Sequence, residues 1–182
     1  MISDRSDIPL YHASYTIVKT IDLSACKKRN DFGRGFYLAT DNEQAEKFVK
    51  TSILKAGQNL KFGYVNLYRM SNFDGLKCYE FIATDKEWLH CVCSYRRTEL
   101  FPNEAGKWEH YDILIGKIAN DYTMSTLAIY LANGYGEVGS EAAIDTAVGV
   151  LKPERLKDQV CLKTERAISK IVYAGSYKVA IK

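Results

Sequence analysis

One segment of the chain is the best guide to its fold, namely Phe32-Gly33-Arg34-Gly35-Phe36-Tyr37-Leu38-Ala39-Thr40. Two glycines at alternate positions allow a tight turn and the close approach of another backbone. The apolar and aromatic residues that follow favour a β-strand over residues 36–40. A phosphate-binding P-loop and a dinucleotide fingerprint are both excluded, because in those motifs the strand comes before the glycines. The segment therefore predicts a glycine-rich turn that leads into a strand carrying Tyr37.

A second segment lies closer to the N-terminus and reads Leu10-Tyr11-His12-Ala13-Ser14. It predicts a short strand that presents His12, followed by two small residues beside which a ligand has room to approach the backbone. A neutral imidazole can hydrogen-bond a sugar hydroxyl without carrying a full charge. A structural or merely exposed histidine is the alternative interpretation.

The strand at 36–40 runs directly into a predicted helix that ends near Gly57. Its start has the spacing of a capping box, with Thr40 as the cap and Glu43 reaching back. The apolar stripe of this helix comprises Ala45, Phe48, Val49, Ser52 and Ile53. If the helix packs across its own strand, Tyr37 and Phe48 flank one flat cavity. Two aromatic faces can hold a planar, positively charged ring, although core packing explains each residue as well.

The remaining elements are short and mixed in order. We expect strands at residues 61–70, 77–82, 111–118 and 159–163, and a final strand or hairpin around Gly175 at 172–181. Helices are expected from a second capping box at Thr84, at 121–132 after a break at Asn120-Asp121, at 140–151 before Pro153, and at 164–171. Regular βαβ alternation is absent, which favours a single α+β domain over residues 1–182 with a largely antiparallel or split sheet.

Composition narrows the class of protein. The 182 residues carry a net charge of +3, too balanced to indicate nucleic-acid binding on electrostatic grounds alone. No apolar run approaches the ~20 residues of a membrane helix, and residues 1–9 lack a signal core. The five cysteines are an odd, scattered set, which favours reduced thiols in a cytoplasmic protein. Among them, Cys91 and Cys93 lie near His90 without the second ligand pair of a structural zinc site, so we expect them to be buried and no metal to be bound.

The two quoted segments resemble motifs of the poly-ADP-ribose polymerases, Leu-Trp-His-Gly-Ser and Phe-Gly-Lys-Gly-Ile-Tyr-Phe-Ala-Asp. Over its whole length the chain is similar to an uncharacterised bacterial branch of the same ADP-ribosyltransferase superfamily. That branch also carries segments like those at 111–121 and 158–162. The resemblance implies an ADP-ribosyltransferase-like split β-sheet with flanking helices, and NAD as co-substrate.

The resemblance also implies a set of site residues. As catalytic residues it implies His12 on the adenosine-side ribose, Tyr37 stacked on the nicotinamide, and Gln159 at the place of the family's glutamate. The main chain of Ala13 would hold the nicotinamide amide, and here alanine replaces glycine, which is compatible with that role where φ is negative. The expected NAD site is completed by Ser14, Gly35, the second stacking position Phe48, and Arg34 directed at the pyrophosphate.

Gln159 is the main departure from the family pattern. A glutamine keeps the hydrogen bond to a ribose hydroxyl but supplies no negative charge, and losing one such contact can cost ~2.7–4 kcal/mol of transition-state stabilisation. Asp121 and Glu165 are candidates for a replacement carboxylate, with helix capping or a solvated surface as the alternative. Restoring glutamate at 159 is expected to raise NAD turnover. We expect Arg96 and Arg97 at the surface.

The favoured function is transfer of one ADP-ribose from NAD to a macromolecular acceptor with release of nicotinamide. The alternatives are an NAD- or ADP-ribose-binding domain without turnover, an NAD glycohydrolase, and an interaction domain with a vestigial pocket. The acceptor is open among protein, nucleic acid and small molecule. The bacterial resemblance further suggests a toxin or effector, paired with a small neutralising antitoxin protein.

Overall fold

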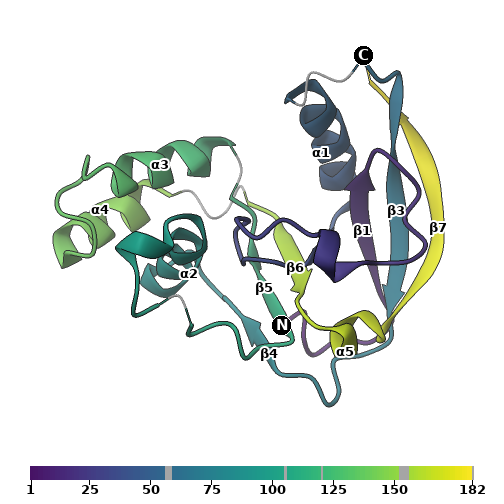
Figure 1. The fold of residues 1–182 in the computed structure, drawn as a ribbon, viewed down its shortest axis with the longest axis horizontal. Helices are drawn as coiled ribbons and strands as arrows, with labels where there is room; N and C mark the ends of the chain where they lie inside the picture. The colour runs from purple at the N-terminus through teal and green to yellow at the C-terminus, as the bar shows by residue number, and fades with distance from the viewer. Residues whose placement is uncertain (56–58, 105, 120, 152–155, 182) are drawn as a thin grey trace.

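A seven-stranded sheet forms the centre of the computed structural model, which describes residues 1–55, 59–104, 106–119, 121–151 and 156–181 (Figure 1). The strands follow the order β4-β5-β6-β2-β1-β3-β7, and every neighbouring pair is antiparallel except β4 with β5. The expected α+β class with a largely antiparallel sheet is therefore confirmed. The strands are β1 (Ile8–Ser14), β2 (Phe36–Ala39), β3 (Phe62–Met70), β4 (Cys78–Glu80), β5 (Ile113–Lys117), β6 (Asp158–Leu162) and β7 (Ile171–Ala180).

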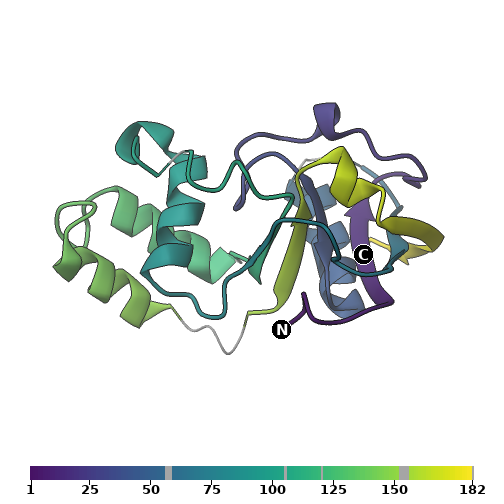
Figure 2. The same ribbon diagram turned by 90° about the horizontal axis from the view of Figure 1, so that it is seen from below.

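Helices cover the sheet in two separate groups. One group is α2, α3 and α4, which pack on one another beside β5 and share a buried cluster with Leu114 of β5 and Cys161 of β6, whereas α1 packs on β1, β3 and β7 (Figure 1). The loop over residues 15–30, which includes the short turn η1 (Leu23–Ala25), packs on the opposite face of β1 from α1 (Figure 2). The helices are α1 (Asn42–Lys55), α2 (Lys86–Arg96), α3 (Asp121–Leu131), α4 (Glu141–Val150) and α5 (Glu165–Ile168), with a second short turn η2 (Thr98–Leu100).

The two halves of the sheet meet along a narrow junction between β1 and β2. Within the described chain these strands share one register pair, Tyr11 with Ala39. By contrast, β1 pairs with β3 along its whole length, from Ile8 to Ser14. A strand with few neighbours on one side leaves main-chain groups that need other partners. The junction between β1 and β2 is therefore where side chains or a ligand can enter the sheet.

Both predicted capping boxes are wrong by one residue. The carboxylate of Asp41, not the hydroxyl of Thr40, accepts from the Gln44 amide at 2.9 Å, and Thr40 instead donates to the Asp158 carbonyl at 3.1 Å. At the second helix Asp85 accepts from the amides of Glu87 and Trp88, while Thr84 is buried. Aspartate and threonine are both common N-caps, with aspartate somewhat preferred, so the spacing of the capping box alone does not choose between neighbours.

The C-terminal segment is one strand, not a hairpin. The register of β3 with β7 passes from Leu67–Gly175 to Tyr68–Tyr173, which leaves Ala174 as an extra residue. Gly175 has a φ of 144°, so the glycine that suggested a hairpin sits in a bulge of a continuous strand. The predicted helix stops at Gly57 and Pro153 and the break at Asn120 lie outside the described residues.

All five cysteines are free thiols, and Cys91, Cys93 and Cys161 are buried. This agrees with the structural role expected for Cys91 and Cys93. In the part of the chain that the structure describes, no helix has the length and apolar character needed to cross a membrane.

Candidate functional site

Three neighbouring strands carry the three expected signature residues. His12 lies on β1, Tyr37 on β2 and Gln159 on β6, and β2 is hydrogen-bonded between the other two. Ala39 pairs with both Tyr11 and Gln159, so the junction residues of β1 and β6 flank the same point of β2. The main chains of residues up to 147 positions apart are thus neighbours in the sheet, and the ring of His12 lies against Phe36, which alternates with Tyr37 along β2.

The imidazole of His12 bridges the junction between the two halves. Its Nδ1 lies 2.8 Å from the main-chain oxygen of Tyr37, and because a carbonyl only accepts, Nδ1 is the protonated nitrogen of the neutral ring. Burial lowers the pKa of His12, which favours this neutral form. The ring packs beside Phe36 at 4.2 Å between centroids. Among the described residues no hydrogen bond reaches Nε2, which is left as an acceptor.

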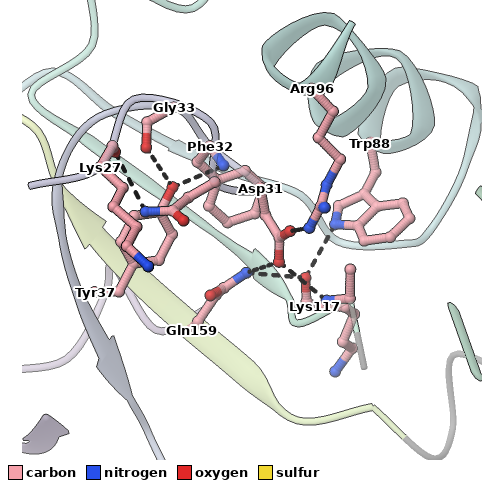
Figure 3. Close-up of polar contacts among 11 residues, drawn as sticks. Lys27, Asp31, Phe32, Gly33, Tyr37, Trp88, Arg96, Lys117 and Gln159 are labelled. Atoms are coloured by element: carbon pink, nitrogen blue, oxygen red, sulfur yellow. Dashed lines mark hydrogen bonds and ion pairs between the residues drawn. The ribbon is translucent and has the colours of Figure 1, made fainter. Parts of the chain in front are cut away.

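Tyr37 uses its hydroxyl to hold the glycine-rich turn. The hydroxyl accepts from the Phe32 amide and donates to the Gly33 carbonyl, each at 2.8 Å (Figure 3). Burial raises the pKa of this phenol well above its ordinary value, so it remains protonated. The ring is half-buried beside the core under α2–α4. The contact of Tyr37 with His12 is made by its main-chain carbonyl and not by its ring.

The two glycines of the turn are explained by packing. Gly33 has a φ of 77°, and a Cβ there would lie 2.6 Å from a ring carbon of Tyr95. A Cβ on Gly35 would collide with the Cys161 sulfur and would lie 2.8 Å from the Leu162 carbonyl oxygen. Gly35 therefore lets β2 approach β6 closely, a requirement that stands whether or not a ligand binds.

Gln159 is buried, with 6% of its surface exposed, and its amide nitrogen faces a carboxylate. The Nε2 atom donates to Oδ2 of Asp31 at 2.9 Å, and the Ala119 amide donates to the same oxygen at 3.1 Å (Figure 3). The side-chain oxygen of Gln159 points away from Asp31 in this view. Asp31 stands directly before the glycine-rich segment, but nothing in the local sequence reveals its distant partners.

Arg96 is half-buried and forms an ion pair with Asp31, which corrects the expectation of a surface residue. Arg97, the next residue, is exposed as expected. A second cation, Lys163, is 5% exposed at its side chain and donates to the Phe32 carbonyl at 3.0 Å and to the Tyr95 hydroxyl at 2.9 Å. The turn at residues 31–33 is thus held from both sides by positive charges.

The remaining NAD-site candidates lie on β1, in the glycine-rich turn and on α1. Ala13 is not among the residues with positive φ, so the condition for its main chain to bond an amide is met. Ser14 accepts from the Thr16 amide at 3.3 Å, and Arg34 is exposed. Phe48 is 59% exposed, so it does not belong to the inner stripe of α1 as predicted; Ala45, Val49 and Ile53 form that stripe.

Of the two proposed replacement carboxylates, Glu165 is exposed in the first turn of α5, where none of the described hydrogen bonds joins it to Gln159, and the side chain of Asp121 lies outside the described residues. A hollow of about 470 Å³ lies past the end of β1 and is lined by residues 15–17, 59–62 and 64. A smaller one, of about 280 Å³, lies at the start of α2. His12, Tyr37 and Gln159 line neither hollow.

The fold and this junction define an α+β protein in which β1 and β2 meet at one register pair and a histidine-to-carbonyl hydrogen bond. The chain belongs to the family described as "Protein of unknown function (DUF3990)", whose profile matches residues 8–173. No curated protein and no solved structure matches the chain.

Proposed function

We propose that the protein is an NAD-dependent mono-ADP-ribosyltransferase, with its site at the junction of β1 and β2. The observation that carries the proposal is the hydrogen bond from His12 Nδ1 to the Tyr37 carbonyl, with Gln159 on the next strand. A sheet joined by one register pair at this point agrees with the split sheet that the sequence motifs imply. The proposal rests on these motifs and this geometry together.

The residues present suit the ribose parts of NAD. His12 offers a neutral acceptor at Nε2 for a hydroxyl of the adenosine-side ribose, because its other nitrogen is committed to Tyr37. Gln159 offers a side-chain oxygen for the 2′-hydroxyl of the nicotinamide-side ribose. Tyr37 offers an aromatic face with a hydroxyl already satisfied, so that only its ring is available for stacking.

In the proposed reaction an acceptor nucleophile forms a bond to C1′ of the ribose as the bond from C1′ to nicotinamide breaks. Nicotinamide leaves as a neutral molecule with the electron pair of that bond, and the nucleophile loses its proton to water. Positive charge grows on the sugar in the transition state, so oxygen dipoles fixed beside it lower the barrier.

A reader of NAD or ADP-ribose without turnover is the second candidate, and one observation favours it. The carboxylate next to Gln159 is Asp31, and its charge is neutralised by Arg96. Without net negative charge at this place, stabilisation of the growing positive charge is reduced.

Incubation with NAD labelled in its adenosine half separates these functions. Label fixed on protein or nucleic acid, together with free nicotinamide, identifies a transferase, and the labelled molecule is the acceptor. Free nicotinamide with no fixed label identifies a glycohydrolase, and saturable binding with neither product identifies a reader. Absence of all three overturns the proposal.

Tyr37→Ala is the matched control and should abolish stabilisation of the fold by nicotinamide; unchanged stabilisation would exclude Tyr37 from the site.

A further inference from the structure

We propose that Asp31 is a positioning residue that fixes the amide of Gln159 with its oxygen directed toward the substrate ribose. This inference rests on the proposed function, since it assigns the hydrogen-bonding role of one residue in that site. In the apo protein, Asp31 already selects one of the two possible orientations of the Gln159 amide.

The selection follows from the acceptors around Nε2. Oδ2 of Asp31 lies 2.9 Å from this atom, and the Lys117 carbonyl lies 3.5 Å away. Both groups can only accept hydrogen bonds, so the NH2 group must face them and the amide oxygen must face away. The opposite orientation would place three oxygen atoms together in a buried site, which is unfavourable.

The acceptors themselves are held in place by α2. Arg96, in the last turn of α2, pairs with the other oxygen of Asp31, and the indole of Trp88 donates to the Lys117 carbonyl at 3.2 Å (Figure 3). Trp88 is fully buried and Asp31 is 8% exposed, so both hydrogen bonds are largely shielded from solvent. Hydrogen bonds to charged groups in such surroundings are stronger than neutral ones.

The fixed amide behaves toward a ligand as an acceptor only. A ribose hydroxyl can donate to its oxygen, and the partial negative charge of that oxygen faces the sugar on which positive charge develops. A carboxylate would present the same acceptor geometry with a full charge. With Asp31 beside it, Gln159 presents its oxygen as a glutamate would, but without the negative charge of a carboxylate.

This arrangement reverses the expectation that Gln159→Glu raises turnover. The new carboxylate would meet Asp31 at the distance of the present hydrogen bond, and two like charges in one buried site disfavour each other's ionised form. The exchanged pair Asp31→Asn with Gln159→Glu keeps the total charge and allows the asparagine to donate to the glutamate. In this double variant the Ala119 amide loses its acceptor on residue 31.

The test uses the whole protein, with two readouts. The first is the side-chain amide signal of Gln159 in the ¹⁵N–¹H spectrum of the apo protein, assigned by its loss in Gln159→Ala. Asp31→Asn should shift this signal and speed its exchange with water, whereas the neighbouring control Arg97→Gln should leave it unchanged. An unchanged signal in Asp31→Asn overturns the contact.

The second readout is steady-state release of nicotinamide from NAD. Asp31→Asn should lower kcat about tenfold or more while KM changes less than about threefold, because the oriented oxygen acts mainly in the transition state. Gln159→Glu alone should be slower than the wild type, and the exchanged double variant should be faster than Gln159→Glu by about tenfold or more. Equal rates for Gln159→Glu and the double variant contradict the inference.

The two readouts keep this inference separate from the proposed function. A wild-type protein that neither binds NAD nor releases nicotinamide removes the proposed function and with it the substrate-directed role of the amide oxygen. The ¹⁵N–¹H readout still decides whether Asp31 selects the orientation. Conversely, NAD turnover that is unaffected in Asp31→Asn keeps the proposed function and overturns the inference.

Discussion

The two sides of the β1–β2 junction are built in opposite ways. On one side, which we call the turn wall, Asp31, Phe32, Tyr37 and Gln159 are linked by side-chain hydrogen bonds and two cations. On the other, the helix wall, His12, Ala13 and Ser14 of β1 are only partly buried, and Phe48 of α1 is largely exposed. Most polar groups of the turn wall are paired within the protein, whereas the helix wall offers partly exposed groups.

This difference indicates how such a site would bind. A wall whose polar groups are mostly paired with one another changes little on binding and therefore fixes the position of the ligand. The open wall must lose side-chain freedom when a ligand stacks on it, which reduces affinity. The predictions below separate the two walls, because changes in the turn wall should affect the fold first and changes in the helix wall should affect the ligand first.

Removal of Asp31 should have the largest effect on stability. Asp31→Ala leaves Arg96 as an unpaired, largely buried charge and removes the acceptor of Gln159, and breaking such a pair costs about 3–5 kcal/mol of unfolding free energy. The control is Arg69→Gln, which breaks the exposed ion pair of Arg69 with Asp7 and should have little effect. Chemical denaturation measures both, and equal losses would show that the turn wall is not rigidly paired.

Gly35→Ala should have the second-largest effect. It should lower the free energy of unfolding by about 3 kcal/mol, because the added methyl group meets the Cys161 sulfur and the Leu162 backbone. Gly149 in α4 is the matched control: a Cβ there meets nothing within 4 Å, so Gly149→Ala should stabilise the fold by roughly 0.5–1 kcal/mol. Thermal unfolding of the two variants should move in opposite directions. A neutral Gly35→Ala would disprove the close approach of β2 to β6.

Alanine substitutions at two neighbouring positions of α1 should change the stability of the fold by different amounts. Val49→Ala empties part of the buried stripe and should cost about 2 kcal/mol, whereas Phe48→Ala should change the free energy of unfolding by less than about 0.5 kcal/mol. If Phe48 is the second stacking residue, its variant should instead lose the stabilisation that NAD gives the wild type. Full retention of that stabilisation would exclude Phe48 from the site.

The smallest effect should come from the titration of His12. Burial lowers its pKa in the folded state below the ordinary 6.5, so the unfolded chain binds more protons in the window between the two values. Stability should therefore fall as pH drops through and below about 6.5, and His12→Gln should flatten this dependence. His90 contributes in the same direction, so some slope should remain. Denaturation curves between pH 5 and pH 8 give the slope, and an identical slope in His12→Gln would contradict the neutral bridge.

Local patterns predicted most strands and helices, because alternation and helical spacing are properties of short segments. They placed the strand of His12, the strand of Tyr37 and the strand of Gln159 within one or two residues of their observed limits. Within α1 the pattern failed, since Phe48 and Val49 are adjacent and apolar and only the packing on the sheet decides which is buried.

Asp31 was beyond the reach of sequence reasoning for a different physical reason. Its partners Arg96 and Gln159 lie 65 and 128 positions away, and a charged residue beside a glycine-rich turn ordinarily indicates a solvated loop. The pairing arises only when β2, β6 and the end of α2 come together. The same long-range assembly turned Arg96 from an expected surface residue into part of the turn wall.

The most direct test of the central claim is a crystal structure of the protein with a non-hydrolysable NAD analogue. We predict a nicotinamide ring stacked on Tyr37, one ribose hydroxyl bonded to Nε2 of His12, and another bonded to the side-chain oxygen of Gln159. A ligand bound away from the junction of β1 and β2, or with its nicotinamide ring remote from Tyr37, would contradict the account.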